Sequence, residues 1–147
     1  MKPVNKIIQV LSFILLSNLL LINTANADIA IVVNKNSPLS SISTREAKRI
    51  FLGVTKRMPN GSDILIIDYE DSSKLKLDFY KKLANKNLTQ VRTRWAGLIF
   101  SGKGIPPKEV SGNEAVKKWL RDNPNGIGYI DEKYMDTSIK KVLTIKN

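Results

Sequence analysis

Residues 63–83 read DILIIDYEDSSKLKLDFYKKL, and this stretch decides the expected fold. The apolar run that ends at Tyr69 predicts a buried strand. Beyond position 74, bulky apolar residues recur at a spacing of four, which predicts an amphipathic helix. Between them lies a short acidic and hydroxyl-rich turn, EDSS. The stretch therefore predicts a strand, a tight turn and a helix that begins at Ser72 and Ser73.

The predicted helix start has two interpretations. A helix N-terminus carries unpaired backbone N–H groups and the positive end of the helix dipole, so it favours anions. Ser72 and Ser73 would then donate hydrogen bonds to a bound anion. The alternative is that one of these serines only caps the helix.

The first 27 residues have the pattern of a secretory signal peptide. Lys2 and Lys6 precede a mostly apolar run over 7–22, and the A-x-A sequence at 25–27 predicts cleavage before Asp28. An uncleaved membrane anchor is the alternative, but the apolar run is short and interrupted by polar side chains. We expect a periplasmic or secreted protein, with residues 28–147 forming a single domain.

The composition indicates acidic partners. The formal net charge is +11, and +9 remains once Lys2 and Lys6 are removed with the signal peptide. Such a charge favours phosphate-like anions, anionic glycolipids or acidic proteins, or it simply keeps the surface solvated. The basic residues are scattered along the sequence and match no nucleic-acid-binding motif, so no nucleic-acid partner is expected.

Patterns elsewhere in the chain predict the remaining elements. Two sequences of the S-x-x-E type, at 43–46 and 111–114, match helix capping boxes. The apolar spacing over 88–100 predicts a further helix. Together with strands at 29–33, 127–130 and 139–145, these elements predict an α/β domain: a mixed, mainly parallel sheet flanked by helices.

The available side chains limit the chemistry. The sequence has no histidine and no cysteine, which excludes Ser-His-Asp and Cys-His catalysis and any metal site built on thiolates or imidazoles. Asp68, Glu70 and Asp71 are the carboxylates from which a glycosidase-like pair could be drawn. We expect no enzymatic activity, no metal and no cofactor. The sequence SGKG at 101–104 is either an anion-binding nest or a simple helix C-cap.

Three segments resemble phosphate-type periplasmic solute-binding proteins. They are IAIVVNKNSPLSSISTREAKRIFLG at 29–53, TRWAGLIFSGKGIPPKEV at 93–110 and NPNGIGYI at 123–130. Their order and spacing agree with that family, in particular with a short, secreted subfamily. The resemblance implies one lobe of a type 2 periplasmic binding protein.

The same resemblance implies a position for the ligand. The serine-rich helix start of that family matches Ser72 and Ser73 here, with Lys76 at a position where the short subfamily tends to have arginine. The loop after the first strand, including Ser41 and Ser43, is expected to complete the site. The implied ligand is phosphate or a similar oxyanion, and the implied partner is a membrane transporter of the ABC type.

Two hypotheses for function follow. The first is a secreted, non-enzymatic solute-binding protein for such a transport system. The second is an envelope interaction or scaffold protein that uses the same lobe to dock a protein or an anionic polymer.

Overall fold

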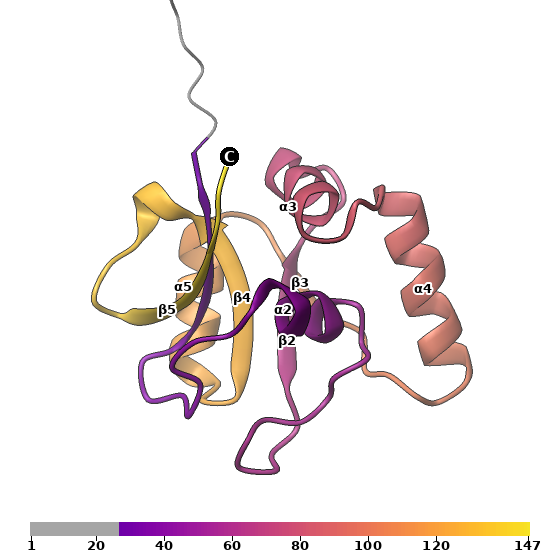
Figure 1. The fold of residues 1–147 in the computed structure, drawn as a ribbon, viewed down its shortest axis with the longest axis horizontal. Helices are drawn as coiled ribbons and strands as arrows, with labels where there is room; N and C mark the ends of the chain where they lie inside the picture. Colours follow the sequence, from indigo (N-terminus) through magenta and orange to yellow (C-terminus); the bar gives the residue numbers. More distant parts are fainter. Residues whose placement is uncertain (1–26) are drawn as a thin grey trace, which may run out of the picture.

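The structure is a computed structural model that describes residues 27–147. The predicted signal peptide therefore lies, apart from Ala27, outside the described residues. The described chain folds around one five-stranded sheet with helices on its two faces (Figure 1). The strand order is β3-β2-β4-β1-β5. The strands are β1 (Ile29–Asn34), β2 (Leu65–Tyr69), β3 (Lys108–Val110), β4 (Gly126–Asp131) and β5 (Ile139–Ile145).

The sheet is mixed, as the sequence predicts. Strand β2 runs parallel to β3 and β4, whereas β1 runs antiparallel to both of its neighbours, β4 and β5. All six residues of β1 are buried, as expected, but the parallel pairing expected for it is wrong. The last residues of β1 consequently lie beside the first residues of β4, with Val33 opposite Ile127.

The helices begin and end at local signals. They are α2 (Thr44–Phe51), α3 (Lys74–Ala84), α4 (Leu88–Phe100), α5 (Asn113–Asp122) and the short 3-10 helix η2 (Glu132–Tyr134). Ser43 and Glu46 exchange the two hydrogen bonds of a capping box at the start of α2, which confirms that prediction. Asn85, with φ of 52°, separates α3 from α4.

The structure corrects one local prediction and adds one strand that the sequence did not predict. The second capping box does not form, because Gly112 is the N-cap residue of α5 and no side chain caps this helix. Gly112 has φ of 88°, a left-handed conformation that glycine adopts without strain. Strand β3 was not predicted from the sequence, since its three residues are partly or fully exposed and carry no apolar pattern.

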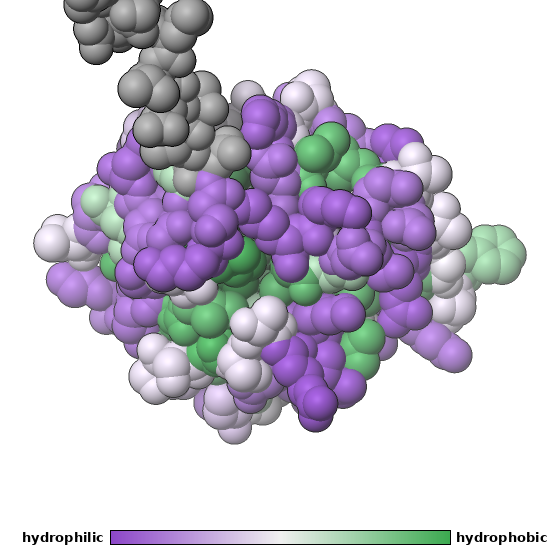
Figure 2. All heavy atoms as spheres, turned by 45° about the horizontal axis from the view of Figure 1, so that its top comes forward, coloured by the Kyte–Doolittle hydropathy of each residue, from purple (hydrophilic) through white to green (hydrophobic). Residues whose placement is uncertain are grey.

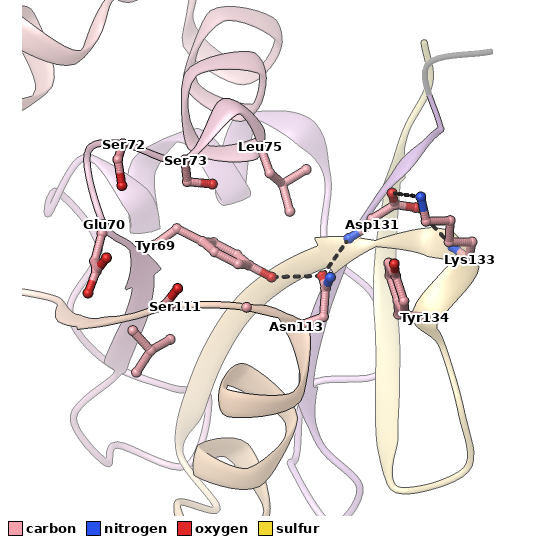
Figure 3. A pocket seen from close by; sticks show the side chains of 12 residues that line it. Tyr69, Glu70, Ser72, Ser73, Leu75, Ser111, Asn113, Asp131, Lys133 and Tyr134 are labelled. Atoms are coloured by element: carbon pink, nitrogen blue, oxygen red, sulfur yellow. Dashed lines mark hydrogen bonds and ion pairs between the residues drawn. The ribbon is translucent and has the colours of Figure 1, made fainter. Parts of the chain in front are cut away.

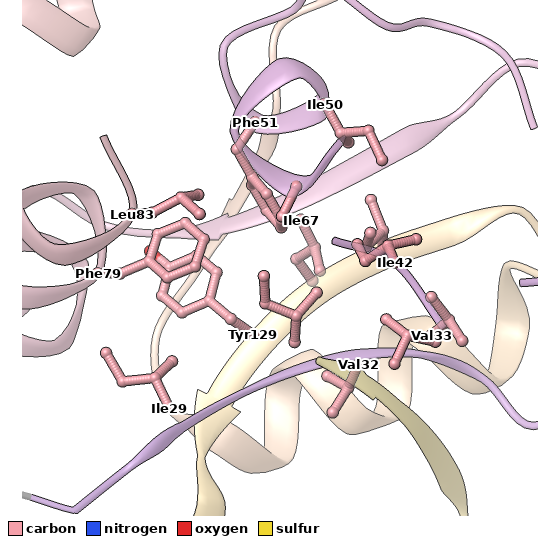
Figure 4. Close-up of a cluster of buried hydrophobic side chains, with 14 of the residues drawn as sticks. Ile29, Val32, Val33, Ile42, Ile50, Phe51, Ile67, Phe79, Leu83 and Tyr129 are labelled. Carbon is pink, nitrogen blue, oxygen red and sulfur yellow. The ribbon is translucent and has the colours of Figure 1, made fainter. Parts of the chain in front are cut away.

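An aromatic cluster joins the helices to one face of the sheet. The rings of Phe79 and Tyr129 stack with centroids 3.6 Å apart, and Phe51 meets Phe79 edge-on at 4.8 Å (Figure 4). This cluster fixes α2 and α3 on the same side of β4. On the other face, Gly128 leaves room for α5, since a Cβ atom there would lie 3.2 Å from a methyl group of Val116.

The face of the molecule drawn in Figure 2 is largely hydrophilic. Figure 2 shows hydrophilic side chains over most of one face, with a hydrophobic side chain projecting at the edge on the side where α4 lies. Within residues 27–147, no helix combines the length and the apolar character needed to cross a membrane.

Candidate functional site

A hollow of about 470 Å³ lies at the carboxyl ends of β2, β3 and β4, between the first turns of α3 and α5. We call it the α3–α5 hollow. Ligands of open α/β sheets commonly bind at this edge of the sheet. It is lined by Tyr69, Glu70, Ser72, Ser73, Leu75, Val110, Ser111, Gly112, Asn113, Asp131, Lys133 and Tyr134.

Two helix N-termini contribute to this hollow. Ser72 and Ser73 line it from the start of α3, and Ser111 and Gly112 line it from the start of α5 (Figure 3). The Ser73 hydroxyl accepts a hydrogen bond from the backbone N–H of Lys76, so Ser73 is also the N-cap residue. Both interpretations of the serine pair thus meet in one place: Ser73 caps the helix and lines the hollow as well.

Asn113 lines the hollow, and hydrogen bonds fix the orientation of its side chain. The Oδ1 atom of Asn113 accepts a hydrogen bond of 2.9 Å from the Tyr69 hydroxyl and one of 3.2 Å from the backbone N–H of Asp131 (Figure 3). These two donors orient the amide and leave its NH₂ group without a protein partner among the described residues. Burial raises the pKa of Tyr69, so its hydroxyl stays a donor at neutral pH.

The formal charges around the hollow nearly cancel. The ammonium group of Lys133 lies 3.0 Å from a carboxylate oxygen of Asp131. The Glu70 side chain has no ion-pair partner within residues 27–147, and it stands beside the first turn of α3. The hollow therefore combines two positive helix ends, hydroxyl donors and one uncompensated carboxylate.

Lys76 does not line the hollow. Its side chain is buried, and its Nζ atom lies 2.9 Å from Asp71, 2.9 Å from Glu109 and 3.6 Å from Asp68. Burial alone would lower the pKa of Lys76, but the three carboxylates outweigh burial and raise it. Lys76 therefore stays charged, and its charge is already balanced by protein carboxylates.

Asp68 belongs to the same buried network. Its carboxylate accepts hydrogen bonds from the hydroxyls of Tyr129 at 2.5 Å and Tyr80 at 2.8 Å. Burial raises the pKa of Asp68, although Lys76 and the hydroxyl donors act in the opposite direction. Asp68 is therefore a core residue, not a residue of the hollow.

Asp71 is paired as well. Its carboxylate lies 2.6 Å from Arg92, in addition to its contact with Lys76, and these two cations lower the pKa of Asp71. Of the three carboxylates noted in the sequence, Glu70 is thus the one that lines the hollow. Asp68 and Asp71 share the ammonium group of Lys76 as ion-pair partners and do not line the hollow, which gives no support to a glycosidase-like pair there.

The structure does not bring Ser41 and Ser43 to the hollow. They follow the carboxyl end of β1, which lies at the start of β4, whereas Ser72 and Ser73 lie beyond the carboxyl end of β2. The hydroxyl of Ser43 is engaged in the capping box of α2. The antiparallel direction of β1 thus places this loop at the opposite end of the sheet.

The SGKG sequence forms a helix C-cap. The backbone N–H groups of Gly102 and Lys103 donate to the carbonyls of Ile99 and Leu98. Since both N–H groups are used within the turn, they are not free to form an anion-binding nest. The residues that sequence reasoning missed are Ser111, Gly112 and Asn113, which reach the hollow from a segment about 40 residues further along the chain.

Comparison with known proteins gives a fold-level answer. Neither the models of protein families nor the curated protein sequences contain a match. Among solved structures, an ABC-type phosphate transport receptor from Vibrio cholerae matches with a TM-score of 0.64 and 19% identity over 80% of this chain. A phosphate ABC transporter substrate-binding protein with bound phosphate from Clostridium perfringens matches with a TM-score of 0.63 and 23% identity over 81% of this chain.

The chain has the fold of one lobe of phosphate-type substrate-binding proteins. PstS from Borrelia burgdorferi agrees, with a TM-score of 0.60 and 15% identity over 81% of this chain. The matches cover 46–48% of these three proteins, so this chain spans about half of their length. The resemblance and the fold class expected from the sequence are thereby confirmed.

Proposed function

We propose that this chain is a secreted, non-enzymatic binding protein that takes a small oxyanion such as phosphate in the α3–α5 hollow. One observation carries the proposal: two helix N-termini, of α3 and α5, open onto one hollow of about 470 Å³. The proteins of similar fold support it, because they include an ABC-type phosphate transport receptor and a substrate-binding protein with bound phosphate.

In this proposal the hydroxyls of Ser72, Ser73 and Ser111 donate to the oxyanion, together with backbone N–H groups at the start of α5. The first turn of α5 has no side-chain cap, which leaves its N–H groups available to a ligand. Lys76 acts indirectly, because it holds the carboxylate of Asp71 away from the ligand. Ser41 and Ser43 have no part in this form of the proposal.

One lobe encloses an anion from one side only, so we expect weak binding, with a dissociation constant of about 1 mM, or about −4 kcal/mol. Transport would require a partner that completes the site, such as a membrane transporter of the ABC type. The secreted location rests on the predicted signal peptide. A mature protein that begins at Asp28, found by mass spectrometry of extracellular or periplasmic fractions, is the result we expect.

Calorimetry tests the binding proposal. Residues 28–147 are titrated with sodium phosphate and with sodium sulfate at low ionic strength. We expect Ser72→Ala to weaken binding by about fivefold, the value of one hydrogen bond. Ser41→Ala is the matched control, since it removes another exposed serine hydroxyl at the far end of the sheet and should change nothing. Absence of heat with millimolar anion, or equal effects of both substitutions, would overturn the proposal.

A further inference from the structure

The excess positive charge lies in two segments of the chain. Residues 44–63 and 85–108 together carry ten basic and two acidic side chains. The other described positions carry twelve basic and eleven acidic side chains. The stretch 85–108 contains five basic residues and no aspartate or glutamate. Residues that look scattered in the sequence are therefore concentrated in α2, α4 and the loops that follow these helices.

The two basic segments pack against each other. The Nε atom of Arg94 in α4 donates a hydrogen bond of 3.1 Å to the carbonyl of Leu52, directly after α2. Gly53 lies against Leu98 and Trp95 of α4, and a Cβ atom at Gly53 would meet Leu98 at 2.5 Å. The basic side chains of α2 (Arg45, Lys48, Arg49) line a hollow that extends to Val54, and Gly53 and Thr55 of the same loop line the neighbouring hollow that holds Lys56 and Lys103.

An apolar turn projects from this basic surface. We call residues 99–105 the α4 tip. Phe100 is 95% exposed, Ile105 is 68% exposed and Ile99 is 45% exposed. The chain reverses at Gly102, so Gly104 returns to contact Leu98 and brings Ile105 back beside the end of α4. Single exposed apolar residues are common, but three in one short turn mark an interaction site.

Lysines flank this apolar turn. Lys103 lies within the α4 tip, and Lys56 lines the same small hollow, of about 270 Å³, as Lys103 and Ile105. Neither lysine has an ion-pair partner among the residues that the structure describes. A projecting apolar turn surrounded by unpaired cations matches the interface of an anionic bilayer, which accepts apolar side chains between its acyl chains and attracts cations to its headgroups.

We propose that the α4 tip docks this protein on the surface of an anionic lipid bilayer. Phe100, Ile99 and Ile105 enter the interface, while Lys56, Lys103 and the basic side chains of α2 contact the headgroups. An acidic protein is the competing class of partner. The lipid surface fits better because Phe100 and Ile99 are exposed outside the hollow that Ile105 lines, as side chains that insert between acyl chains are.

The docking orientation leaves the α3–α5 hollow open. The α4 tip precedes the amino end of β3, whereas the hollow lies at the carboxyl ends of β2 and β3, which run parallel. Figure 1 shows the same separation, with α3 at the upper end of the molecule and the loop after α4 at the lower end. Lipid docking is thus independent of anion binding in the hollow.

Sedimentation with vesicles tests the proposal on residues 28–147. We expect binding to vesicles of phosphatidylcholine with 30% phosphatidylglycerol at low salt and little binding to pure phosphatidylcholine. The double variant Lys56→Ser/Lys103→Ser should bind about tenfold or more weakly, because each cation at an anionic surface contributes about fivefold. Phe100→Ser should weaken binding by about tenfold through lost apolar burial.

Matched controls make the result decisive. Lys35→Ser/Lys118→Ser removes the same charge from exposed positions away from the α4 tip and should reduce binding far less. In a gain-of-signal arm, Phe100→Trp should show a blue shift of its fluorescence on the anionic vesicles, whereas Lys118→Trp should not. The proposal is overturned if the two lysine pairs lose binding equally, if the vesicles do not bind the protein, or if polyglutamate binds it and vesicles do not.

Discussion

The ammonium group of Lys76 lies 2.9 Å from the Oδ1 atom of Asp71. In the sequence these two residues flank the serines at the start of α3. A cation close to a helix N-terminus is ordinarily read as a ligand for an anion. Here the cation faces the protein, with Asp68 and Glu109 as its other partners. In the proposed site, the groups that hold the anion at the start of α3 are therefore backbone N–H groups and hydroxyls, and not the Lys76 ammonium group.

Removing the Lys76 charge should destabilise the fold. Lys76→Met leaves the buried carboxylate of Asp68 without its cation, and we expect a loss of about 3 kcal/mol in the free energy of unfolding at pH 7. Lys74→Met is the control, because its ion pair with Asp78 is exposed and contributes less than about 0.5 kcal/mol. Urea denaturation measures both, and equal effects would contradict the buried network.

The pH dependence of the free energy of unfolding should reflect the ionisation of Asp68. Burial raises the pKa of Asp68 in the folded state above its ordinary value of 3.8, so the folded state binds a proton more tightly than the unfolded state. Ionisation of Asp68 therefore lowers the stability of the folded state as pH rises above about 4. Asp68→Asn removes this contribution, so the unfolding free energy of the variant relative to the wild type should increase from pH 4 to pH 7.

Asp136 should behave in the opposite way. Its hydrogen bonds with Lys117 and Ser138 lower its pKa in the folded state, so its stabilising contribution is present above its ordinary pKa of 3.8 and is lost as pH falls below that value. The loss in the free energy of unfolding that Asp136→Asn causes should thus be largest at neutral pH. Denaturation at several pH values distinguishes the two variants, and parallel profiles would contradict these pKa directions.

Gly128 should tolerate no side chain. A Cβ atom at this position would lie 2.5 Å from a methyl group of Ile67, between the sheet and α5, so Gly128→Ala should cost about 1–3 kcal/mol. Gly97 in α4 has no atom within 4 Å of the same position, and Gly97→Ala should stabilise the protein by about 0.5–1 kcal/mol. Thermal denaturation should separate the two, and an unchanged or higher stability of Gly128→Ala would contradict the close packing of α5 on the sheet.

Removing the Glu70 charge should strengthen anion binding. Glu70 lines the α3–α5 hollow without an ion-pair partner in residues 27–147, so Glu70→Gln should increase phosphate affinity by about threefold. Asp122→Asn removes an equal charge at the far end of α5 and serves as the control. Calorimetry with phosphate gives both values. A gain that is the same for the two variants would indicate a general effect of net charge.

The sequence predicted those features that short-range patterns determine. The capping box of α2 and the bounds of α4 follow from residues within a few positions of each other, and both are confirmed. The fold class follows from the alternation of such segments. The burial of residues 29–33 in β1 was also predictable, because five apolar residues in succession leave the strand no polar face for solvent.

The direction of β1 and the partners of Lys76 were not predictable in the same way. Strand direction depends on pairing with β4, almost 100 residues further along the chain, and it determines that Ser41 and Ser43 lie away from Ser72. Glu109, which pairs with Lys76, is 33 residues distant and lies in a strand with no apolar pattern. Long-range contacts of this kind leave no local signal.

The most direct test of the proposed site is a titration of ¹⁵N-labelled residues 28–147 with sodium phosphate, followed by NMR. Anion binding in the α3–α5 hollow predicts saturable shifts of the backbone N–H signals of Ser73, Lys74, Gly112 and Asn113, at the first turns of α3 and α5. It also predicts unchanged signals for Arg45 and Lys48 on the basic surface of α2. Shifts confined to Arg45 and Lys48, or no shifts at all, would contradict anion binding in the α3–α5 hollow.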